Sequence, residues 1–254
     1  MTGKTPTSSI SPTTRQLAWL GFGADVLMTI GLMLVLSLVA GIAWALLQGG
    51  QGSDIPVLAQ IAMAVVSTGG TAVLLYLARR RASEAEKNAS LAAIYRPSTW
   101  GWAMAAGLLV FAGSNLLSFV VSQLGDMPQP SNLGLMSQAM DQYPWVLLVF
   151  AVVLAPFYEE LLFRRVLFGR LATAGLVWPG IVVTSLLFAL THEIPGLSGN
   201  GWLGTAQLWL VYGLMGTVFA WVYHRTGTLL AAILAHAINN GLALLVLATG
   251  IAAG

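Results

Sequence analysis

Long apolar stretches separated by short polar connectors form the dominant pattern along the chain. A stretch of about 20 such residues can cross the hydrocarbon core of a bilayer as a helix. The stretches that approach or exceed that length are 18–48, 57–78, 100–123, 144–168, 177–192, 203–223 and 228–249. The sequence therefore predicts an all-α protein, a polytopic transmembrane helical bundle of about seven spans.

The remaining segments divide the chain. Residues 1–17, rich in Thr, Ser and Pro, are typical of a disordered cytoplasmic tail. Segments 49–56 and 124–143 contain Pro and Gly and are expected to be connectors. The first span is too long for a signal peptide and should remain as an anchor. We expect three units: the tail at 1–17, three helices and their connectors at 18–143, and four helices at 144–254.

Composition supports a membrane protein. Hydrophobic residues make up 57% of the chain and charged residues 8%, and the mean hydropathy is +0.81. Soluble domains carry about 25% charged residues. Cysteine is absent, which excludes disulfides and thiolate chemistry. The formal charge of +2 is explained by topology, and we expect no nucleic-acid partner.

Basic residues orient the spans. The 79–99 connector carries Arg79, Arg80, Arg81, Lys87 and Arg96. Because Lys and Arg concentrate in cytoplasmic loops, this connector and the N-terminus are expected inside and the C-terminus outside. All eleven Lys and Arg residues then lie on the inner side or at its boundary. The acidic residues expected outside are Asp54, Asp126, Asp141 and Glu193. With no organelle signal, a prokaryotic plasma membrane is favoured.

Two adjacent carboxylates interrupt the fourth span. A charge at the bilayer centre costs roughly 2.5–3.5 kcal/mol on insertion scales, so Glu159 and Glu160 need partners or a function. Arg164 is four residues beyond Glu160, so the two share a helical face and can form an ion pair. Glu159 points about 100° away from Glu160 and needs a partner of its own.

The next segment supplies that partner. Gly175 and Pro179 are suited to a helix end and a helix start, which predicts an antiparallel hairpin centred near 175. Equal helical rises then bring Glu159 to the depth of His192, with Phe188 one turn away on the same face. A lone histidine near a helix end is more often a packing residue, but the shared depth favours a site.

The last span adds His236 and Asn240, which are four residues apart and share a face. Asn239, three residues from His236, fits that face equally well, so spacing does not choose between the two asparagines. Hydrogen bonding between helices is the alternative explanation for such residues in a membrane.

Together these residues resemble the CPBP intramembrane protease family, the CAAX-processing and bacteriocin-processing enzymes also called Abi proteins. The three family motifs occur in order: Glu-Glu-x-x-x-Arg at 159–164, Phe-x-x-x-His at 188–192 and His-x-x-x-Asn at 236–240. The resemblance covers about residues 144–245, which makes 144–254 the expected catalytic core. Arg165 stands where many members have glycine, at a position expected to face the cytoplasmic interface.

The resemblance implies hydrolysis of a peptide bond in a membrane-associated or lipidated peptide or protein. Burial disfavours the charged form of a carboxylate and so suits Glu159 to accept a proton from water, with His192 assisting. His236 and Asn240 are expected to stabilise the oxyanion. Glu160 and Arg164 are expected to support the site, and Phe188 to form its wall.

A metal is the open alternative for this site. Glu159, His192 and His236 are of the residue types that bind zinc with an open fourth position. The zincin helix motif is missing, because Gly196 stands where its second histidine would be and Pro195 would break the helix. A glutamate-type enzyme without a cofactor is favoured.

Other classes fit less well. Gly196-Leu-Ser198-Gly199 resembles the short motif of rhomboid serine proteases, but it lies in a connector. An aspartyl intramembrane protease needs two buried aspartates, and Asp25 is the one aspartate within a predicted span. A proton-coupled transporter would favour an inverted repeat, which the sequence lacks. A non-proteolytic immunity protein or scaffold with the same motifs is not separable by sequence.

Overall fold

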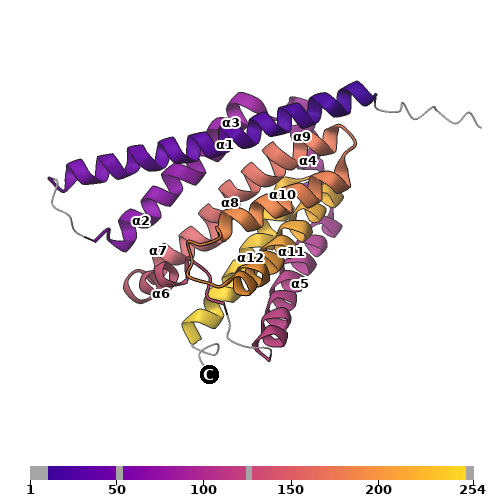
Figure 1. Ribbon diagram of the computed structural model, residues 1–254. Coiled ribbons are helices and arrows are strands. Elements are labelled where there is room, and N and C mark those ends of the chain that lie inside the picture. Colours follow the sequence, from indigo (N-terminus) through magenta and orange to yellow (C-terminus); the bar gives the residue numbers. More distant parts are fainter. Residues whose placement is uncertain (1–10, 50–53, 124–127, 250–254) are drawn as a thin grey trace, which may run out of the picture.

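The computed structural model describes residues 11–49, 54–123 and 128–249, and every regular element within them is helical (Figure 1). The elements are α1 (Pro12–Leu47), α2 (Val57–Ala64), η1 (Val65–Gly69), α3 (Gly70–Arg79), α4 (Glu84–Ile94), α5 (Pro97–Ser122), α6 (Leu133–Gln142), α7 (Pro144–Val149), η2 (Phe150–Leu154), α8 (Ala155–Glu160), η3 (Leu161–Phe168), α9 (Gly169–Thr173), α10 (Val177–His192), α11 (Trp202–Thr226) and α12 (Leu229–Thr249). The three η segments are π-helical turns inside longer helices.

Six of the continuous helices are long and apolar enough to cross a membrane: Pro12–Leu47, Val57–Arg79, Pro97–Ser122, Pro144–Thr173, Trp202–Thr226 and Leu229–Thr249. The protein is therefore a multi-pass membrane protein. The seventh predicted span, 177–192, forms a helix with the predicted bounds, but its 16 residues fall short of the others. Six helices, rather than the expected seven, therefore reach the length of a full span, and α10 is a shorter apolar helix beside them.

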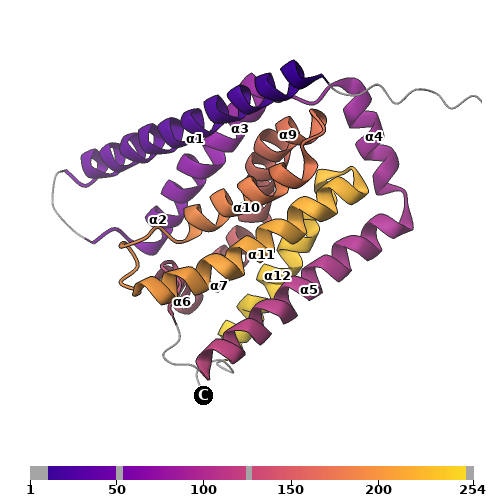
Figure 2. The same ribbon diagram turned by 45° about the vertical axis from the view of Figure 1, so that its right-hand side comes forward.

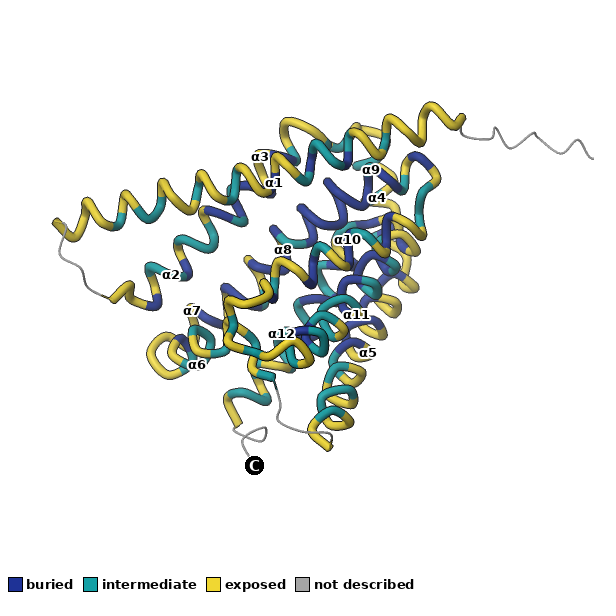
Figure 3. Tube along the Cα trace, viewed as in Figure 1, coloured by how far each residue is buried: buried dark blue, intermediate teal, exposed yellow. Residues whose placement is uncertain are grey.

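Burial separates a central helix from peripheral ones. In Pro144–Thr173, 56% of the most apolar window is buried inside the molecule, against 6% in α1 (Figure 3). Large apolar side chains such as Leu34 and Leu38 are exposed along α1. Because the lipid phase is apolar, these exposed side chains suit a bilayer. The fourth span, which carries the glutamates, is thus enclosed by its neighbours.

Several element boundaries differ from the sequence prediction. The helix α1 begins at Pro12, so residues 12–17 are helical rather than part of a disordered tail. Ser11 caps this end, because its side chain accepts from the Thr14 N–H. Residues 1–10 of the predicted tail lie outside the described residues. The connectors at 79–99 and 124–143 contain the short helices α4 and α6.

The long helices pack as an up-and-down bundle. Helices α1, α2 and α3 cover one side, α5 lies on the other, and α10, α11 and α12 lie between them beside the central helix (Figure 2). At Gly107, α5 approaches α12 so closely that an added Cβ would lie 2.7 Å from the carbonyl oxygen of Ala235. The N-terminal end of α1 and the C-terminal end of α12 lie at opposite ends of the bundle (Figure 1).

The predicted hairpin near residue 175 is confirmed. Helix α9 ends at Thr173, Gly175 has φ +72°, and α10 begins at Val177. A positive φ of this kind is accessible to glycine without strain. The turn reverses the chain, so that α10 runs back beside α9 and η3.

Candidate active site

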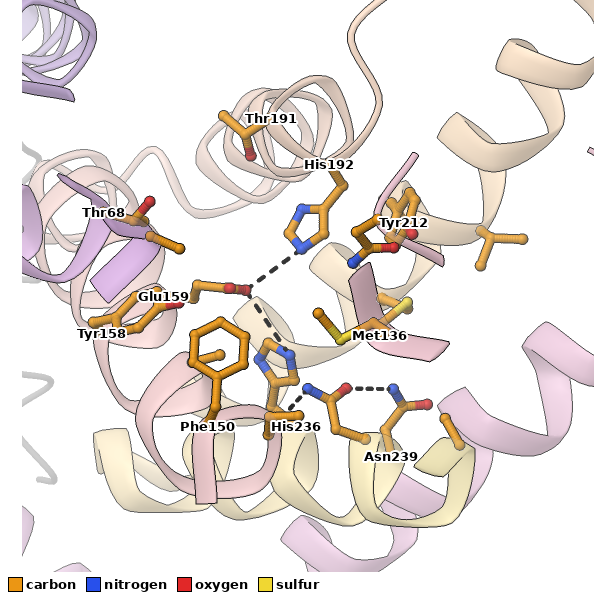
Figure 4. A pocket seen from close by; sticks show the side chains of 18 of the residues that line it. Thr68, Met136, Phe150, Tyr158, Glu159, Thr191, His192, Tyr212, His236 and Asn239 are labelled. Atoms are coloured by element: carbon orange, nitrogen blue, oxygen red, sulfur yellow. Dashed lines mark hydrogen bonds and ion pairs between the residues drawn. The ribbon is translucent and has the colours of Figure 1, made fainter. Parts of the chain in front are cut away.

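The candidate residues of three separate helices meet at one place. Glu159 and Glu160 lie at the end of α8, His192 is the last residue of α10, and His236 lies on α12. Figure 4 shows the Glu159 carboxylate pointing between the two imidazole rings. Glu159 Oε2 lies 3.5 Å from His192 Nε2 and 3.9 Å from His236 Nε2. The equal depth inferred for Glu159 and His192 is confirmed.

Glu160 has a second partner that the sequence did not indicate. Its side chain is fully buried, and its Oε2 accepts from Arg164 Nε at 2.8 Å, as the four-residue spacing predicted. Its other oxygen, Oε1, lies 3.0 Å from His236 Nδ1. Glu160 therefore connects the buried arginine to the histidine. Spacing within one helix reveals the first contact, whereas the second depends on how α12 packs.

Arg164 is held by aromatic faces as well as by Glu160. The guanidinium carbon lies 5.9, 5.1 and 6.0 Å from the ring centroids of Phe163, Phe188 and Phe219, within cation–π range. Its Nη1 and Nη2 are buried without a hydrogen-bond partner among the described residues. The rings thus substitute for hydrogen bonds that would otherwise compensate this buried charge.

Aromatic stacking fixes both imidazoles. Phe188 lies on the same face of α10 as His192, with ring centroids 4.2 Å apart. It is fully buried behind the imidazole and is not among the described residues that line the cavity. Tyr212 lies on the other side of His192 at 4.7 Å. Phe219 stacks on His236 at 4.8 Å with an interplanar angle of 19°. The rings have little freedom to turn away from Glu159.

The hydrogen bonds at Nδ1 determine what Nε2 can do. His192 Nδ1 lies 2.8 Å from the Phe188 carbonyl oxygen, which can only accept, so Nδ1 carries a proton. His236 Nδ1 faces the Glu160 carboxylate in the same way. In the neutral rings both Nε2 atoms are then acceptors, and they face Glu159 Oε2, a buried oxygen without a hydrogen-bond partner in the described structure. Three acceptors converge on one point.

Asn240 lies beside Glu159 and the two histidines because of a proline in the central helix, Pro144–Thr173. The Ala155 N–H donates to the Phe150 carbonyl in the π-helical turn η2, so it does not reach Ala151. The next residue, Pro156, has no N–H. Asn240 Nδ2 donates to the orphaned Ala151 carbonyl at 2.9 Å. The π-helical turn and the proline thus create the acceptor that anchors the asparagine.

Both asparagines of α12 belong to the site. Asn239 is buried, and its Nδ2 donates to Asn240 Oδ1 at 3.1 Å. Each amide nitrogen keeps a second N–H, because an amide carries two donors. The structure therefore brings both asparagines to the cavity and does not choose one of them.

A cavity of about 530 Å³ opens in front of Glu159. Its walls come from the N-terminal as well as the C-terminal half of the chain, including Met33 of α1, Thr68 of η1, Ser114 of α5 and Met136 of α6. The prediction of a catalytic core confined to 144–254 therefore omitted part of the cavity wall. Hydrophobic patterns locate spans but do not say which spans face one another.

Glu193 and Asn200 form a clamp that holds one wall of the cavity in place. Neither was among the site residues predicted from the sequence. Glu193 is fully buried and accepts from the Ser131 N–H at 3.2 Å and from Asn200 Nδ2 at 3.3 Å. Asn200 also pairs with both the N–H and the carbonyl of Gln129, and Ser131 Oγ donates to the His192 carbonyl. This clamp fixes residues 129–131 against the end of α10. Glu193 directly follows the candidate His192, the one signal that could have drawn attention to it.

Residues of the rejected protease classes lie elsewhere. Ser198 is in the connector between α10 and α11, and its hydroxyl oxygen accepts from Asn200 Nδ2 at 3.1 Å. Asp25 is buried on α1 and binds Arg79 and Arg170 through its two oxygens. This aspartate connects α1 to α3 and α9 at the end of the bundle, away from Glu159.

The described residues offer no clear zinc site. Glu159, His192 and His236 are the three candidate ligands, yet within residues 11–49, 54–123 and 128–249 no group of three or more His, Asp or Glu side chains is arranged to hold a metal ion.

Comparisons with known proteins agree with the motifs. Residues 141–242, which contain all the candidate residues, match the family described as type II CAAX prenyl endopeptidase Rce1-like. The membrane-embedded CAAX protease MroQ of Staphylococcus aureus (strain USA300) is 30% identical over 152 residues, which cover 55% of this chain and 55% of that protein. The chain thus spans about half the length of this curated relative. No solved structure matches.

Proposed function

Because residues 141–242 match the Rce1-like family of CAAX prenyl endopeptidases, we propose that this protein is an intramembrane endopeptidase in which Glu159 activates a water molecule. The observation that carries the proposal is the position of Glu159 Oε2 between two acceptor Nε2 atoms, at 3.5 and 3.9 Å. Three acceptors facing one another need a donor between them. A water molecule donates two hydrogen bonds and meets that need.

The proposed reaction begins with proton transfer. Water bound at this point gives a proton to Glu159, and its oxygen attacks the carbonyl carbon of the scissile peptide bond. His192 accepts the second hydrogen bond of that water. This contact keeps a lone pair of the water oxygen directed at the scissile peptide bond. When the C–N bond breaks, Glu159 returns the proton to the leaving amine. The products are one carboxylic acid and one amine, so water is consumed without any other reactant.

The oxyanion of the tetrahedral intermediate is proposed to lie against α12. For this step His236 takes up a second proton from solvent, so that its Nε2 donates to the oxyanion while the water donates to Glu159 and His192, and the Glu160 carboxylate at 3.0 Å stabilises the imidazolium. Asn240 contributes the amide N–H that Ala151 does not use, and Asn239 lies beside it. Glu160 and Arg164 act as positioning residues, since they contact the histidine rather than the reacting atoms.

The substrate is proposed to be a membrane-associated or lipidated peptide or protein. The cavity is enclosed by membrane helices, and the matched relative carries the name of a CAAX protease. We propose the plasma membrane of a prokaryote as its location, with the N-terminus in the cytoplasm and the C-terminus outside.

Substitution of Glu159 tests the function directly. Wild type and Glu159→Gln are reconstituted in liposomes and supplied with a panel of prenylated and unprenylated peptides, and the products are identified by mass spectrometry. A lost general base should lower the rate by about 10²–10⁴-fold. Asp141→Asn, an exposed carboxylate on α6, serves as the matched control and should retain the wild-type rate. Equal cleavage by wild type and Glu159→Gln would refute the proposal.

Removal of metal ions by a chelator distinguishes a glutamate-type enzyme from a zinc-dependent one. With water alone as the activated species, dialysis against EDTA should leave the rate unchanged. If zinc is held by Glu159, His192 and His236, the dialysed protein should lose activity and regain it when zinc is added.

A further inference from the structure

Four arginines meet at the end of the bundle where α9 is followed by the turn to α10. Arg79 ends α3 and Arg80 follows it, whereas Arg165 lies on η3 and Arg170 on α9. Helix α1 packs against both α3 and α9 here, and α3 packs against η3 (Figure 1). These four residues, called the arginine cluster below, therefore belong to neighbouring parts of the bundle.

Two carboxylates pair with the arginine cluster. Asp25 of α1 is fully buried and accepts from Arg79 Nε at 2.9 Å through one oxygen and from Arg170 Nε through the other. Glu86 of α4 accepts two hydrogen bonds from Arg165. Because four guanidinium groups share two negative charges, the cluster keeps an excess of two positive charges.

Arg80 forms no ion pair with a carboxylate among the described residues. Its Nη2 donates to the Gly169 carbonyl at 3.3 Å, and its Nε is buried without a hydrogen-bond partner in this part of the chain. Burial and the nearby Arg165 guanidinium lower the pKa of Arg80 below its ordinary value of 12.5. Since arginine stays protonated in proteins, this positive charge is left without full compensation.

An anion with several oxygen atoms suits this arrangement. Guanidinium groups bind phosphate through pairs of N–H donors, and phosphate carries the negative charge that the cluster lacks. The cluster can be reached from outside, because the side chains of Arg79 and Arg170 are 34% and 21% exposed. A phosphate beside them offsets the excess charge at an accessible face of the bundle.

The arginine cluster lies at the level expected of phospholipid headgroups. Arg79 ends one of the long apolar helices, and Arg170 lies close to the end of another. Leu74 and Leu77, in the last turns of α3 before Arg79, are exposed apolar side chains. The acyl chains of a lipid can contact such side chains while its phosphate reaches the arginines at the interface.

We propose that the arginine cluster binds the headgroup phosphate of a phospholipid with net negative charge. A zwitterionic phospholipid carries a cation beside its phosphate, which weakens its attraction to the cluster, so the site should select for anionic lipids. This site is separate from the proposed catalytic function, because none of the four arginines lines the cavity in front of Glu159.

Competition between two lipids tests the proposal. The purified full-length protein is equilibrated in mixed micelles with equal amounts of phosphatidylglycerol and phosphatidylcholine of identical acyl chains, and the retained lipids are quantified by mass spectrometry. Wild type should retain phosphatidylglycerol preferentially, and Arg80→Gln should lower this preference by about fivefold, the typical contribution of one basic residue. Arg15→Gln, which removes an exposed cation of α1 outside the cluster, is the matched control and should keep it. Equal retention of the two lipids by wild type, or equal losses in both variants, would overturn the proposal.

Glu86→Gln provides a change of opposite sign. Without this carboxylate, Arg165 loses its charge partner, and the preference for phosphatidylglycerol should rise by about fivefold. A variant that had merely lost its fold could not show such a gain. Glu84→Gln removes a carboxylate that pairs with Lys87 outside the cluster, and it should leave the preference unchanged. A preference that is unchanged or lower in Glu86→Gln would contradict the role of the excess charge.

Free phosphate tests whether the bound anion belongs to a lipid. Inorganic phosphate is added to the micelles in large excess, and sodium chloride of the same ionic strength is the control for screening. The two salts should lower the retained phosphatidylglycerol equally, because its acyl chains add apolar contacts that free phosphate lacks. Specific displacement of the lipid by phosphate would assign the site to a soluble anion and overturn the proposal of a lipid site.

Discussion

Single residues of the site owe their positions to partners that are distant in sequence. Asn240 is fixed by the carbonyl of Ala151, which is 89 positions away and is free because Pro156 lacks an N–H. His236 is fixed by Glu160 in a similar way, across 76 positions. The motifs revealed which residue types are present and the Glu160–Arg164 contact. Residue spacing could not reveal which asparagine binds the backbone, because Asn239 and Asn240 are three and four residues from His236 and either spacing brings a side chain near it.

The hydrogen bond between Asn240 and Ala151 predicts that two substitutions, Asn240→Ala and Pro156→Ala, have non-additive effects on stability. Asn240→Ala leaves the Ala151 carbonyl unsatisfied and should destabilise the protein by about 1–3 kcal/mol. Pro156→Ala supplies a new backbone N–H in the same turn, so it should offset part of that loss in the double variant. Thermal unfolding in detergent measures all three variants.

Asn115→Ala is the control for this pair, because Asn115 is exposed and bonds only within its own helix, to the Phe111 carbonyl. It should change the melting temperature little. Strictly additive effects of Asn240→Ala and Pro156→Ala would show that the two residues do not share the Ala151 carbonyl.

At the scale of elements, the sequence was informative where helices are regular. The turn at Gly175 allowed the depth of His192 to be calculated from residue counts, and the contact with Glu159 confirms it. The short helix α4 was missed, although its capping box of Ser83 and Glu86 is a recognisable start signal. The π-helical turns could not be predicted, since only Pro156 hints at one of them.

The ion pair between α4 and η3 predicts a dependence on pH. Glu86 accepts two hydrogen bonds from Arg165, at 2.9 and 2.7 Å. These bonds, and a further one from the Ser83 backbone, lower the pKa of Glu86 to about 2. A lowered carboxyl pKa stabilises the fold above the ordinary value of 4.5, and this contribution is lost as the pH falls through about 2.

The melting temperatures of wild type and Glu86→Gln should therefore differ at neutral pH and converge between about pH 4.5 and 2. The difference should be small, because the Glu86 side chain is 39% exposed and solvent screens the pair. Glu84→Gln, which removes the more exposed Glu84–Lys87 pair on the same helix, is the control and should show no such convergence. A constant difference across this range would contradict the assignment.

The clamp of Glu193 and Asn200 predicts an effect on catalysis without contact to the reacting atoms. Glu193→Ala removes the acceptor that holds residues 129–131 against the end of α10, and His192 is the last residue of that helix. Misplacement of His192 should lower kcat by about tenfold or more.

Glu193→Gln keeps one acceptor oxygen and should stay close to the wild-type rate, so rescue by this variant distinguishes positioning from loss of fold. Melting temperatures are measured beside the rates. A wild-type kcat for Glu193→Ala would mean that the clamp does not position His192.

At the scale of the whole molecule, hydropathy was sufficient to predict a multi-pass helical protein and six of its long helices. It did not predict that α1, η1, α5 and α6 would help to enclose the cavity. An apolar span exposes similar side chains to lipid and to another helix, so the pattern does not specify neighbours. The involvement of the N-terminal helices emerges only from packing.

The proposed orientation predicts the accessibility of the two ends of the bundle. Because the chain has no cysteine, Ala85→Cys on α4 and Leu197→Cys in the α10–α11 connector each create a unique label site. A membrane-impermeant maleimide should label Leu197→Cys in intact cells, and Ala85→Cys only after permeabilisation. The reverse pattern would contradict the orientation with a cytoplasmic N-terminus.

The shortness of α10 has a consequence for the supply of water. Its 16 residues extend about 24 Å, less than the hydrocarbon thickness of about 30 Å. Trp178, Val182, Leu186 and Leu190 form an exposed apolar stripe along it, so this short helix faces lipid. Hydrophobic mismatch of this kind thins the adjacent leaflet or draws polar headgroups inward. His192 is at the end of this helix, so we expect a local depression of the bilayer beside it. In the proposed reaction, this depression would let water reach Glu159 without crossing a full layer of acyl chains.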